Sequence, residues 1–522
     1  MKRLQKTVAW LLAALLLLSA ASLAAVAAKE TAQTDVPMIF VAGFVSTDTV
    51  DQETGEALFP PTSKTIRKAV KDAVNPVLKS ALKGEFRGLD YPLNQAVLSL
   101  LDGLRCDENG DPINPRTGTV YQWPTPEEVR AACDHGFQKP SDDAIYYSYD
   151  WRLDMKTLAE QLHDFIEYVL DCTGAQKVDI IAYSMGTCVL SSYLNLYKGE
   201  YIDSLILYLG ALNGSSACGD PFENSLGMDS ESLMAALNGL LGTDLKAEIG
   251  KALLDILYQK GMMDPPVDLV EGLLDRVFDE LYRQSMPYIF GRIPGFWAMI
   301  PVEYYDGVRN TFSAGVVSDV FYEKVDYYHN VQLNIPTIIR TAMDAGVKIV
   351  DVVKYGYPIA PIIRDRNHES DFVVDTTYSS IGATCAAYNE TLPEGYVQQK
   401  HPEKNYLSPD NKIDASTCAF PDQTWFIKNS THLGTLSGGT DGEQPLLLWL
   451  LTREPQPTVW DDPAFPQYMT YLPDGTCAPL TAETNWSVLG NYKQEDGFLA
   501  RLKRIFADWK QIFSLLVQSV KK

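Results

Sequence analysis

The sequence predicts an α/β fold with a mostly parallel central sheet, helices on both faces of the sheet and an inserted helical cap. Three observations support this prediction. Short apolar runs with strand character alternate with amphipathic helical patterns through much of the chain. One such run, 178–182, ends in a sharp turn that leads at once into a helical pattern. Between about residues 216 and 341 the strands stop, and helical patterns rich in Leu, Met, Phe and Tyr dominate.

The expected core elements follow one another in chain order. Residues 37–42 form a short apolar run that is typical of a central strand. Apolar residues recur on one face over 155–172, which predicts an amphipathic helix. Residues 455–479 are rich in proline and are expected to be irregular. The other expected strands are 144–149, 178–182, 202–209, 347–353 and 424–427, and a last core helix is expected at 444–451.

These elements divide the chain into parts. The core is expected to comprise 36–215, interrupted by a mixed insertion at 50–140, and 342–455. The cap, 216–341, follows directly after a core strand, a position that suits a lid moving on hinges. Residues 456–522 form a C-terminal extension.

The end of this extension, 497–522, has apolar residues at helical spacing together with several lysines and arginines. Two interpretations stay open, because a wide apolar stripe fits both. The helix packs on the surface of the core, or it lies on a lipid interface as a peripheral membrane contact.

The N-terminus has the pattern of a secretory signal. Lys2, Arg3 and Lys6 precede an uncharged apolar stretch, 8–28, which ends in small residues that fit a cleavage site. We therefore expect a signal peptide at 1–28 and a secreted, extracellular or cell-surface protein. The alternative is an uncleaved anchor, since the stretch is long enough to span a bilayer.

Charge and cysteine content narrow the class further. The chain has 67 acidic and 44 basic residues, which argues against a nucleic-acid partner. Eight cysteines in an exported protein predict some disulfides. The candidate pairs are Cys106–Cys133 and Cys385–Cys418, which bracket polar loops, whereas Cys188 is expected to be a buried thiol.

The turn after 178–182 carries the most informative side chain. Ser184 lies between Ala182 and Gly186, and a helical pattern follows directly. Strand, sharp turn and helix in this order are the context of a nucleophile elbow, which lifts a serine hydroxyl clear of the sheet. The alternative interpretation is an ordinary serine that caps the helix.

A serine nucleophile needs a base, and the base needs a carboxylate that orients it. In this fold the acid and the histidine follow the serine in that order. His432 is the candidate base, because it lies in a polar loop between an expected strand and the last core helix. Asp371 is the candidate acid, with Asp375 as the alternate. His329 lies near the end of the expected cap, and His368 and His401 lie in charged loops.

The oxyanion of such a reaction needs two backbone donors. One is expected to be the N–H of Met185, which follows the nucleophile. The other is expected from the loop after the first strand, at Phe44.

Several short motifs in these regions resemble the lecithin:cholesterol acyltransferase family and the related lysosomal-type phospholipases and bacterial lipases. Tyr149-Asp-Trp-Arg152 is similar to that family's Tyr-Asp-Trp-Arg element, and 209–215 is similar to its Leu-Gly-Ala-Pro-x-x-Gly-Ser element. Residues 292–301 resemble its Arg-x-Pro-Ser-x-x-Trp-x-Leu-Pro element. The resemblance runs from about 36 to 451 and implies an α/β-hydrolase fold.

The resemblance also implies roles for individual residues. Ser370-Asp-Phe-Val-Val374 stands where the family has Gly-Asp-Gly-Thr-Val, which carries the catalytic acid onto Asp371. Trp151 and Trp297 lie in the matching elements and are expected to bind substrate. The chain departs from the family at Ala182, where the elbow usually has glycine, at Asn213 and at Phe372.

The expected function is a secreted serine esterase or lipase that hydrolyses acyl esters of lipids through Ser184, His432 and Asp371. The alternative is an O-acyltransferase that moves a fatty acyl group to an alcohol or sterol. A third, different class is a catalytically silent surface-binding protein on the same scaffold. We expect no cofactor and no metal, since Asp107–Asp111 lacks the glycine and the glutamate of a calcium loop.

Overall fold

The protein is described here from a computed structural model. The residues that it describes are 36–44, 49–59, 98, 101–119, 123–134, 144–223, 279, 282–283, 286–312, 315–359, 367–388, 390–432, 434, 441–472 and 474–486. Four expected features therefore lie wholly or largely outside the described residues: the signal peptide, much of the 50–140 insertion, the first part of the cap and the C-terminal helix.

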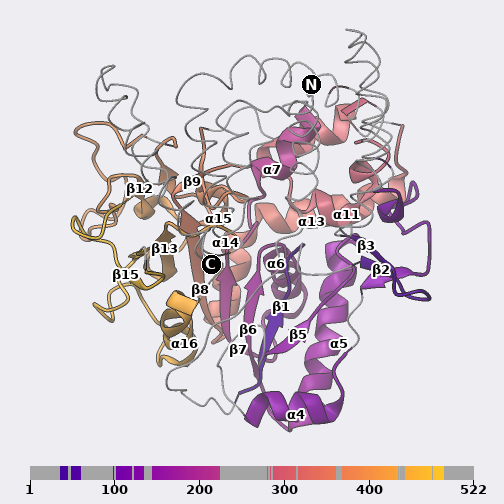
Figure 1. The fold of residues 1–522 in the computed structure, drawn as a ribbon, viewed down its shortest axis with the longest axis horizontal. Coiled ribbons are helices and arrows are strands. Elements are labelled where there is room, and N and C mark those ends of the chain that lie inside the picture. The colour runs from indigo at the N-terminus through magenta and orange to yellow at the C-terminus, as the bar shows by residue number, and fades with distance from the viewer. Residues whose placement is uncertain are drawn as a thin grey trace, which may run out of the picture.

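An eight-stranded sheet runs through the centre of the molecule (Figure 1). Its strand order is β15-β14-β13-β8-β7-β6-β1-β5, and every neighbouring pair is parallel except β14 and β15. The strands are β1 (Met38–Val41), β5 (Ile145–Tyr147), β6 (Val178–Tyr183), β7 (Ile202–Tyr208), β8 (Lys348–Tyr355), β13 (Thr424–Lys428), β14 (Tyr468–Tyr471) and β15 (Cys477–Pro479). The mostly parallel sheet predicted from the sequence is confirmed.

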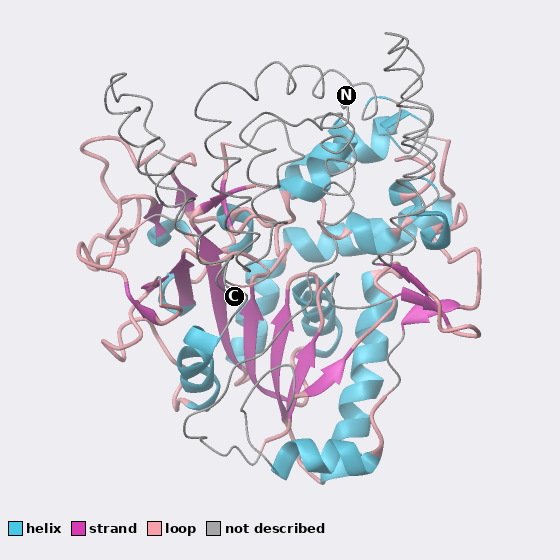
Figure 2. Cartoon of the chain, in the orientation of Figure 1, coloured by secondary structure: helices cyan, strands magenta, loops and turns pink. Residues whose placement is uncertain are grey.

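The two faces of the sheet are buried against different helices, because successive side chains of a strand point to opposite faces. Ile180 belongs to the core formed with α5 (Met155–Thr173), α6 (Gly186–Tyr197), α13 (Asp319–Leu333) and α14 (Ile335–Asp344). Ile181, the next residue, belongs to the core formed with α16 (Gln444–Thr452). Figure 2 shows these helices on either side of the strands. Helices therefore cover both faces, as expected.

Local signals explain the bounds of α5. Asp154 caps the N-terminus, with its carboxylate accepting from the Thr157 N–H at 3.0 Å. Gly174 ends the helix in a left-handed conformation, with φ 75°. The apolar face between them is buried, including Leu158, Leu162 and Phe165.

Smaller elements surround the sheet. Three short strands pair antiparallel, β2 (Thr49–Asp51), β3 (Ala57–Phe59) and β4 (Thr117–Thr119), and two further pairs are β9 (Tyr357–Pro358) with β10 (Glu369–Ser370) and β11 (Thr384–Cys385) with β12 (Ile413–Asp414). The other α-helices with described bounds are α4 (Pro126–Asp134), α7 (Ser216–Gly219), α11 (Pro294–Trp297), α12 (Tyr305–Gly307) and α15 (Thr376–Ser379). Short 3-10 turns lie at 102–104, 220–223, 290–292, 302–304, 415–417, 421–423 and 441–443, and a π-helical turn lies at 308–312.

Two regions differ from the simple picture given by the sequence. Residues 455–479, expected to be irregular, contain β14 and β15, which extend the sheet beyond β13. α13 lies within the expected cap segment and α14 begins in it, yet α13 packs against α5 and α6, and α14 packs against α6, in the main core. The prolines and glycines around β14 made the segment look irregular in sequence, whereas its pairing with β13 makes it a strand.

All eight cysteines are free thiols in this structure, so neither expected pair, Cys106–Cys133 or Cys385–Cys418, is bonded. Cys106 is buried in the main core cluster, whereas Cys385 and Cys418 belong to one smaller core cluster beside β13. The spacing of cysteines around a loop does not fix the distance and orientation that a disulfide requires, so it could not decide which cysteines are bonded.

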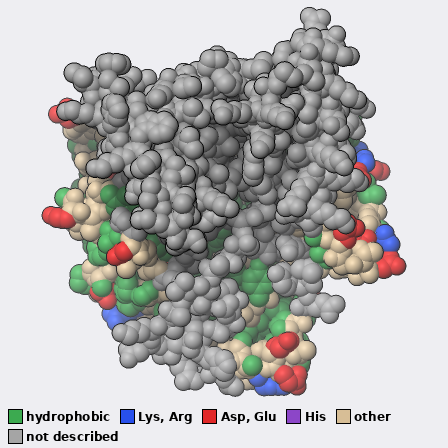
Figure 3. Space-filling model, in the orientation of Figure 1, with side chains coloured by type: hydrophobic (Ala, Val, Ile, Leu, Met, Phe, Trp, Pro, Cys, Tyr) green, Lys and Arg blue, Asp and Glu red, His purple; other side chains and the backbone are tan. Residues whose placement is uncertain are grey.

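Among the described residues, no helix is both long and apolar enough to cross a membrane. On the face drawn in Figure 3, the described surface mixes hydrophobic, acidic and basic side chains along its margins.

Candidate active site

The turn after β6 has the geometry of a nucleophile elbow. Ser184 has φ 55°, in the left-handed region that non-glycine residues rarely adopt. The turn is held from the helix side, because both the N–H and the hydroxyl of Thr187 donate to the Ser184 carbonyl, at 3.0 and 2.7 Å. α6 begins two residues after the serine. The backbone strain of about 1–2 kcal/mol is therefore offset by hydrogen bonds of the same turn.

Small residues around the serine have a direct steric reason. A Cβ at Gly186 would lie 2.7 Å from the Val41 carbonyl oxygen and 2.8 Å from that of Ala42. Gly43, on the loop after β1, packs as closely, since a Cβ there would lie 2.8 Å from the Ser184 Cβ. Ala182 is fully buried in β6, and its methyl group packs in the core, so the alanine in place of the usual glycine is accommodated there.

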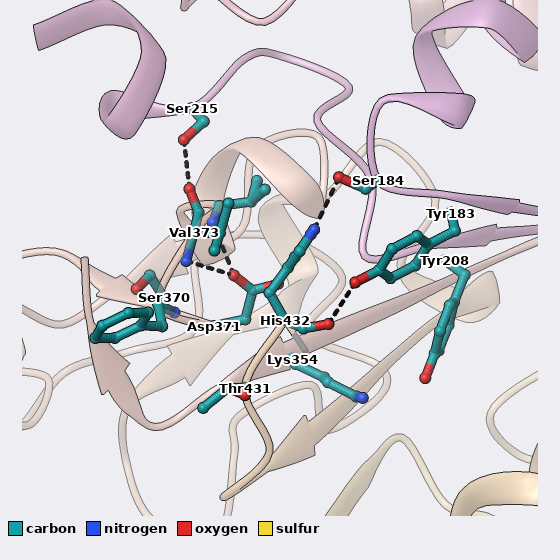
Figure 4. A network of polar contacts seen from close by, with 12 residues as sticks. Tyr183, Ser184, Tyr208, Ser215, Lys354, Ser370, Asp371, Val373, Thr431 and His432 are labelled. Carbon is teal, nitrogen blue, oxygen red and sulfur yellow. Dashed lines mark hydrogen bonds and ion pairs between the residues drawn. The ribbon is translucent and has the colours of Figure 1, made fainter. Parts of the chain in front are cut away.

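Ser184, His432 and Asp371 meet in one chain of hydrogen bonds, although they come from three separate parts of the sequence (Figure 4). The Ser184 Oγ lies 2.8 Å from His432 Nε2, and His432 Nδ1 lies 2.6 Å from Asp371 Oδ2. All three side chains are buried, and Ser184 keeps 6% of its surface exposed. These distances allow a proton to pass from the serine to the imidazole.

Asp371 lies in a tight turn after β10. Its Oδ1 accepts hydrogen bonds from the Val373 and Val374 N–H groups, at 2.9 and 2.7 Å. Its Oδ2 is thereby left to His432. Phe372, which stands where the family has glycine, adopts φ 85° in the same turn. The turn divides the two oxygens of one carboxylate between backbone and imidazole.

Asp375, the alternate acid, is used elsewhere. Its two oxygens accept from the N–H and the hydroxyl of Ser216, both at 2.8 Å, and Oδ1 lies 3.0 Å from His368 Nδ1. Asp375 thus ties the segment after β7 to the acid turn. Of the two candidates, the structure brings Asp371 to His432.

The other candidate histidines lie away from Ser184. His329 stacks on the Tyr305 ring at 3.8 Å, and burial lowers the pKa of its imidazole. His401 is half exposed and lies 3.5 Å from Glu403. Their contacts are those of structural and surface residues.

The expected oxyanion donors lie beside the elbow. Met185 stands at the N-terminal cap of α6, where backbone N–H groups have no partner within the helix. The Phe44 ring packs edge-on against Trp151, with 4.4 Å between the ring centroids. The Tyr149 hydroxyl donates to the Ala42 carbonyl at 2.7 Å and anchors the loop that carries Phe44. The roles of both amides stay predictions.

The two tryptophans expected to bind substrate are buried in the structure. Trp151 is fully buried, and its indole N–H donates to the Thr49 hydroxyl at 3.1 Å. Trp297 packs among aromatic rings, and its indole N–H donates to the Gly291 carbonyl at 3.2 Å. A Cβ at Gly295 would lie 1.8 Å from the Trp151 carbonyl, so the two motif regions are in direct contact. In this structure both tryptophans are packed inside the protein and hold together the two motif regions beside the site.

Sequence reasoning missed two polar features near His432. The Tyr183 hydroxyl donates to the His432 carbonyl at 2.6 Å. Lys354 and Glu443, both fully buried, form an ion pair at 3.0 Å, and the Tyr208 hydroxyl donates to the same carboxylate. A Lys inside a strand pattern was the available signal, since a buried lysine requires a partner.

No group of three or more His, Cys, Asp and Glu side chains in the described part of the chain is placed to hold a metal ion. In the loop weighed as a calcium site, Asp107 Oδ1 accepts from the backbone N–H groups of Asn109 and Asp111, at 2.8 and 3.0 Å. Asp111 is paired with Lys324 at 2.7 Å. This is the bonding of a turn.

The strand order, the elbow at the carboxyl end of β6 and the positions of the acid and the histidine define an α/β-hydrolase fold. No curated protein matches the chain. Among solved structures, a chain in the crystal structure of the Tle4–Tli4 complex is similar at 13% identity, over 62% of this chain and 75% of that chain, with a TM-score of 0.23. Residues 128–219, which contain the elbow, match the model of the lecithin:cholesterol acyltransferase family. The match supports the resemblance inferred from the motifs over this segment, which is similar to the lecithin:cholesterol acyltransferase family.

Proposed function

We propose that the protein is a secreted serine carboxylic-ester hydrolase that acts on acyl esters of lipids. The observation that carries the proposal is the hydrogen-bond chain from Ser184 through His432 to Asp371. A buried, ordered set of nucleophile, base and acid serves acyl transfer. The match of residues 128–219 to a family named for acyl transfer from lecithin supports a lipid ester as substrate.

In the proposed reaction the Ser184 hydroxyl attacks the ester carbonyl and His432 takes its proton. Asp371 holds the imidazole in the tautomer that can accept this proton at Nε2. The Met185 and Phe44 amides donate to the oxyanion. The tetrahedral intermediate collapses when His432 returns the proton to the leaving alcohol, and the acyl group stays on Ser184. Water, activated by His432, then releases the fatty acid.

The deciding experiment is covalent labelling with a fluorophosphonate, together with hydrolysis of a soluble p-nitrophenyl ester. We expect labelling of the wild-type protein and loss of labelling in Ser184→Ala, with hydrolysis lowered by about 10⁴-fold or more. Ser379→Ala is the matched control, because Ser379 is buried and its hydroxyl has no partner among the described residues. Labelling that persists in Ser184→Ala would reject the assignment.

A second function uses the same site with another acceptor. The family match favours it, since acyl transfer to an alcohol or sterol replaces only the water of the last step. Product analysis with and without added alcohol separates the two reactions. Fatty acid as the sole product in both conditions supports hydrolysis, whereas a new ester in the presence of the alcohol supports transfer.

A further inference from the structure

Tyr183, the residue before the nucleophile, lies beside the proposed base and contacts it (Figure 4). Its hydroxyl donates to the His432 carbonyl at 2.6 Å. Its ring lies beside the imidazole, with 5.1 Å between the ring centroids. One side chain therefore contacts both the main chain and the ring of His432.

This contact joins two elements that must stay in register for proton transfer. Tyr183 ends β6, which is paired with β1 on one side and with β7 on the other. His432 lies in the segment after β13, two strands beyond β7 in the sheet. The hydrogen bond thus links the main chain of the base to the strand that leads to the nucleophile. The other bonds of His432 join its backbone N–H and Nδ1 to Asp371 and its Nε2 to Ser184.

The Tyr183 ring is itself held in place. It packs between Phe40 and Tyr208, with centroid distances of 6.1 and 5.9 Å. The Tyr208 hydroxyl is bound to Glu443, which pairs with Lys354. Burial, followed by the nearby Asp371 carboxylate, raises the pKa of the Tyr183 hydroxyl well above its ordinary value, so the group stays a donor.

We propose, on the basis of the function above, that Tyr183 is a positioning residue whose hydroxyl keeps the His432 imidazole aligned with Ser184. Proton transfer depends on the distance and angle between Nε2 and the serine oxygen, and a displacement of about 1 Å is enough to lower a rate about 100-fold. Loss of the hydroxyl leaves a buried carbonyl without its donor and frees the base to shift.

Tyr183→Phe tests the proposal, because it removes one hydroxyl and keeps the ring. Tyr147→Phe is the matched control, since the Tyr147 hydroxyl is buried and has no partner among the described residues. With a soluble short-chain ester we expect kcat of Tyr183→Phe to fall about 10- to 100-fold, with KM changed less than about twofold. The rate of fluorophosphonate labelling is expected to fall by the same factor. Tyr147→Phe is expected to keep kcat.

Two measurements separate positioning from folding. Rates are normalised to the folded fraction, and hydrogen exchange is followed for a peptide that spans Asn429–His432. We expect faster exchange of that peptide in Tyr183→Phe, with peptides of β6 unchanged. An unchanged kcat, or a fall in kcat fully accounted for by the folded fraction, would overturn the positioning role. Absence of Ser184-dependent labelling in the wild-type protein would instead reject the proposed function.

Discussion

His432 and Asp371 are joined twice, by side chain and by main chain. The imidazole Nδ1 lies 2.6 Å from the Asp371 carboxylate, and the His432 N–H donates to the Asp371 carbonyl at 2.7 Å. A displacement of the acid turn therefore moves the base as well. This rigid pair explains how two loops, separated by 61 residues in sequence, can present one orientation of the imidazole to Ser184.

Replacement of the acid is expected to disable the base and leave the turn in place. In Asp371→Asn the amide oxygen can still accept from the Val373 and Val374 N–H groups. The amide nitrogen then faces His432, which favours the wrong tautomer. We expect kcat on a soluble ester to fall by about 10³- to 10⁴-fold, with KM little changed.

Asp375→Asn is the control for this variant. Asp375 holds Ser216 and His368 and makes no contact with His432 among the described interactions. We expect a lower Tm, with kcat within a few fold of the wild-type value. The opposite pattern, with activity lost at Asp375 and kept at Asp371, would reassign the acid.

Gly186 is expected to tolerate no larger side chain, because a Cβ there meets two backbone carbonyls that cannot move away. Gly186→Val is expected to destabilise the protein by at least about 1–3 kcal/mol and to abolish fluorophosphonate labelling. Ala182→Gly, the control, restores the usual elbow glycine. This variant is expected to be labelled at a rate within about threefold of the wild-type rate, because it removes only one methyl group. Equal labelling by both variants would show that the close approach at Gly186 is not required.

Removal of one partner of the buried Lys354–Glu443 pair is expected to destabilise the protein strongly. Glu443→Gln leaves a fully buried ammonium without its counter-charge. We expect a loss of about 3–5 kcal/mol in the free energy of unfolding, read as a lower midpoint in denaturant. The double variant Lys354→Met with Glu443→Leu is expected to recover much of this loss. A single variant as stable as the wild type would contradict the expectation.

The buried carboxyl of Asp179 is expected to make the stability of the protein depend on pH. Burial, followed by repulsion from Asp203, raises the pKa of its carboxyl from 3.8 to about 7. Between these values the folded state keeps a proton that the unfolded state releases, so stability falls as the pH rises, by about 1.4 kcal/mol per pH unit. Below pH 4 the group contributes no such loss.

The variant Asp179→Asn removes this charge, and its amide oxygen can still accept from the Ser204 N–H. Thermal unfolding at pH 5 and pH 8 provides the measurement. We expect the variant to gain in Tm over the wild type by more at pH 8 than at pH 5. An equal difference at both pH values would show that Asp179 does not titrate in this range.

Much of the site could be predicted because its parts are local in sequence. Ala182, Ser184 and Gly186 mark the end of a strand, a strained turn and the start of a helix. Gly186 is required because a larger side chain would clash with the backbone beside it. The order of nucleophile, acid and histidine along the chain left four candidate histidines, and His432 was preferred because it lies in a polar loop between an expected strand and the last core helix. The mainly apolar runs of β6, β7 and β8 predicted these strands for a similar reason, because a parallel strand covered by helices on both faces is buried along nearly its whole length.

Local sequence patterns were enough to predict six of the eight sheet strands, the elbow and the candidate nucleophile and base, because strand burial and turn geometry are encoded over a few adjacent residues. Asp371 was the candidate acid from the sequence, and the tertiary structure places it, rather than Asp375, within hydrogen-bond distance of His432. The buried anchoring of Trp151 and the bond from Tyr183 to His432 are features that only the tertiary structure reveals. Each of these joins residues tens to hundreds of positions apart. Contacts between such distant residues depend on the twist and register of the whole sheet, which cannot be read from a local sequence pattern.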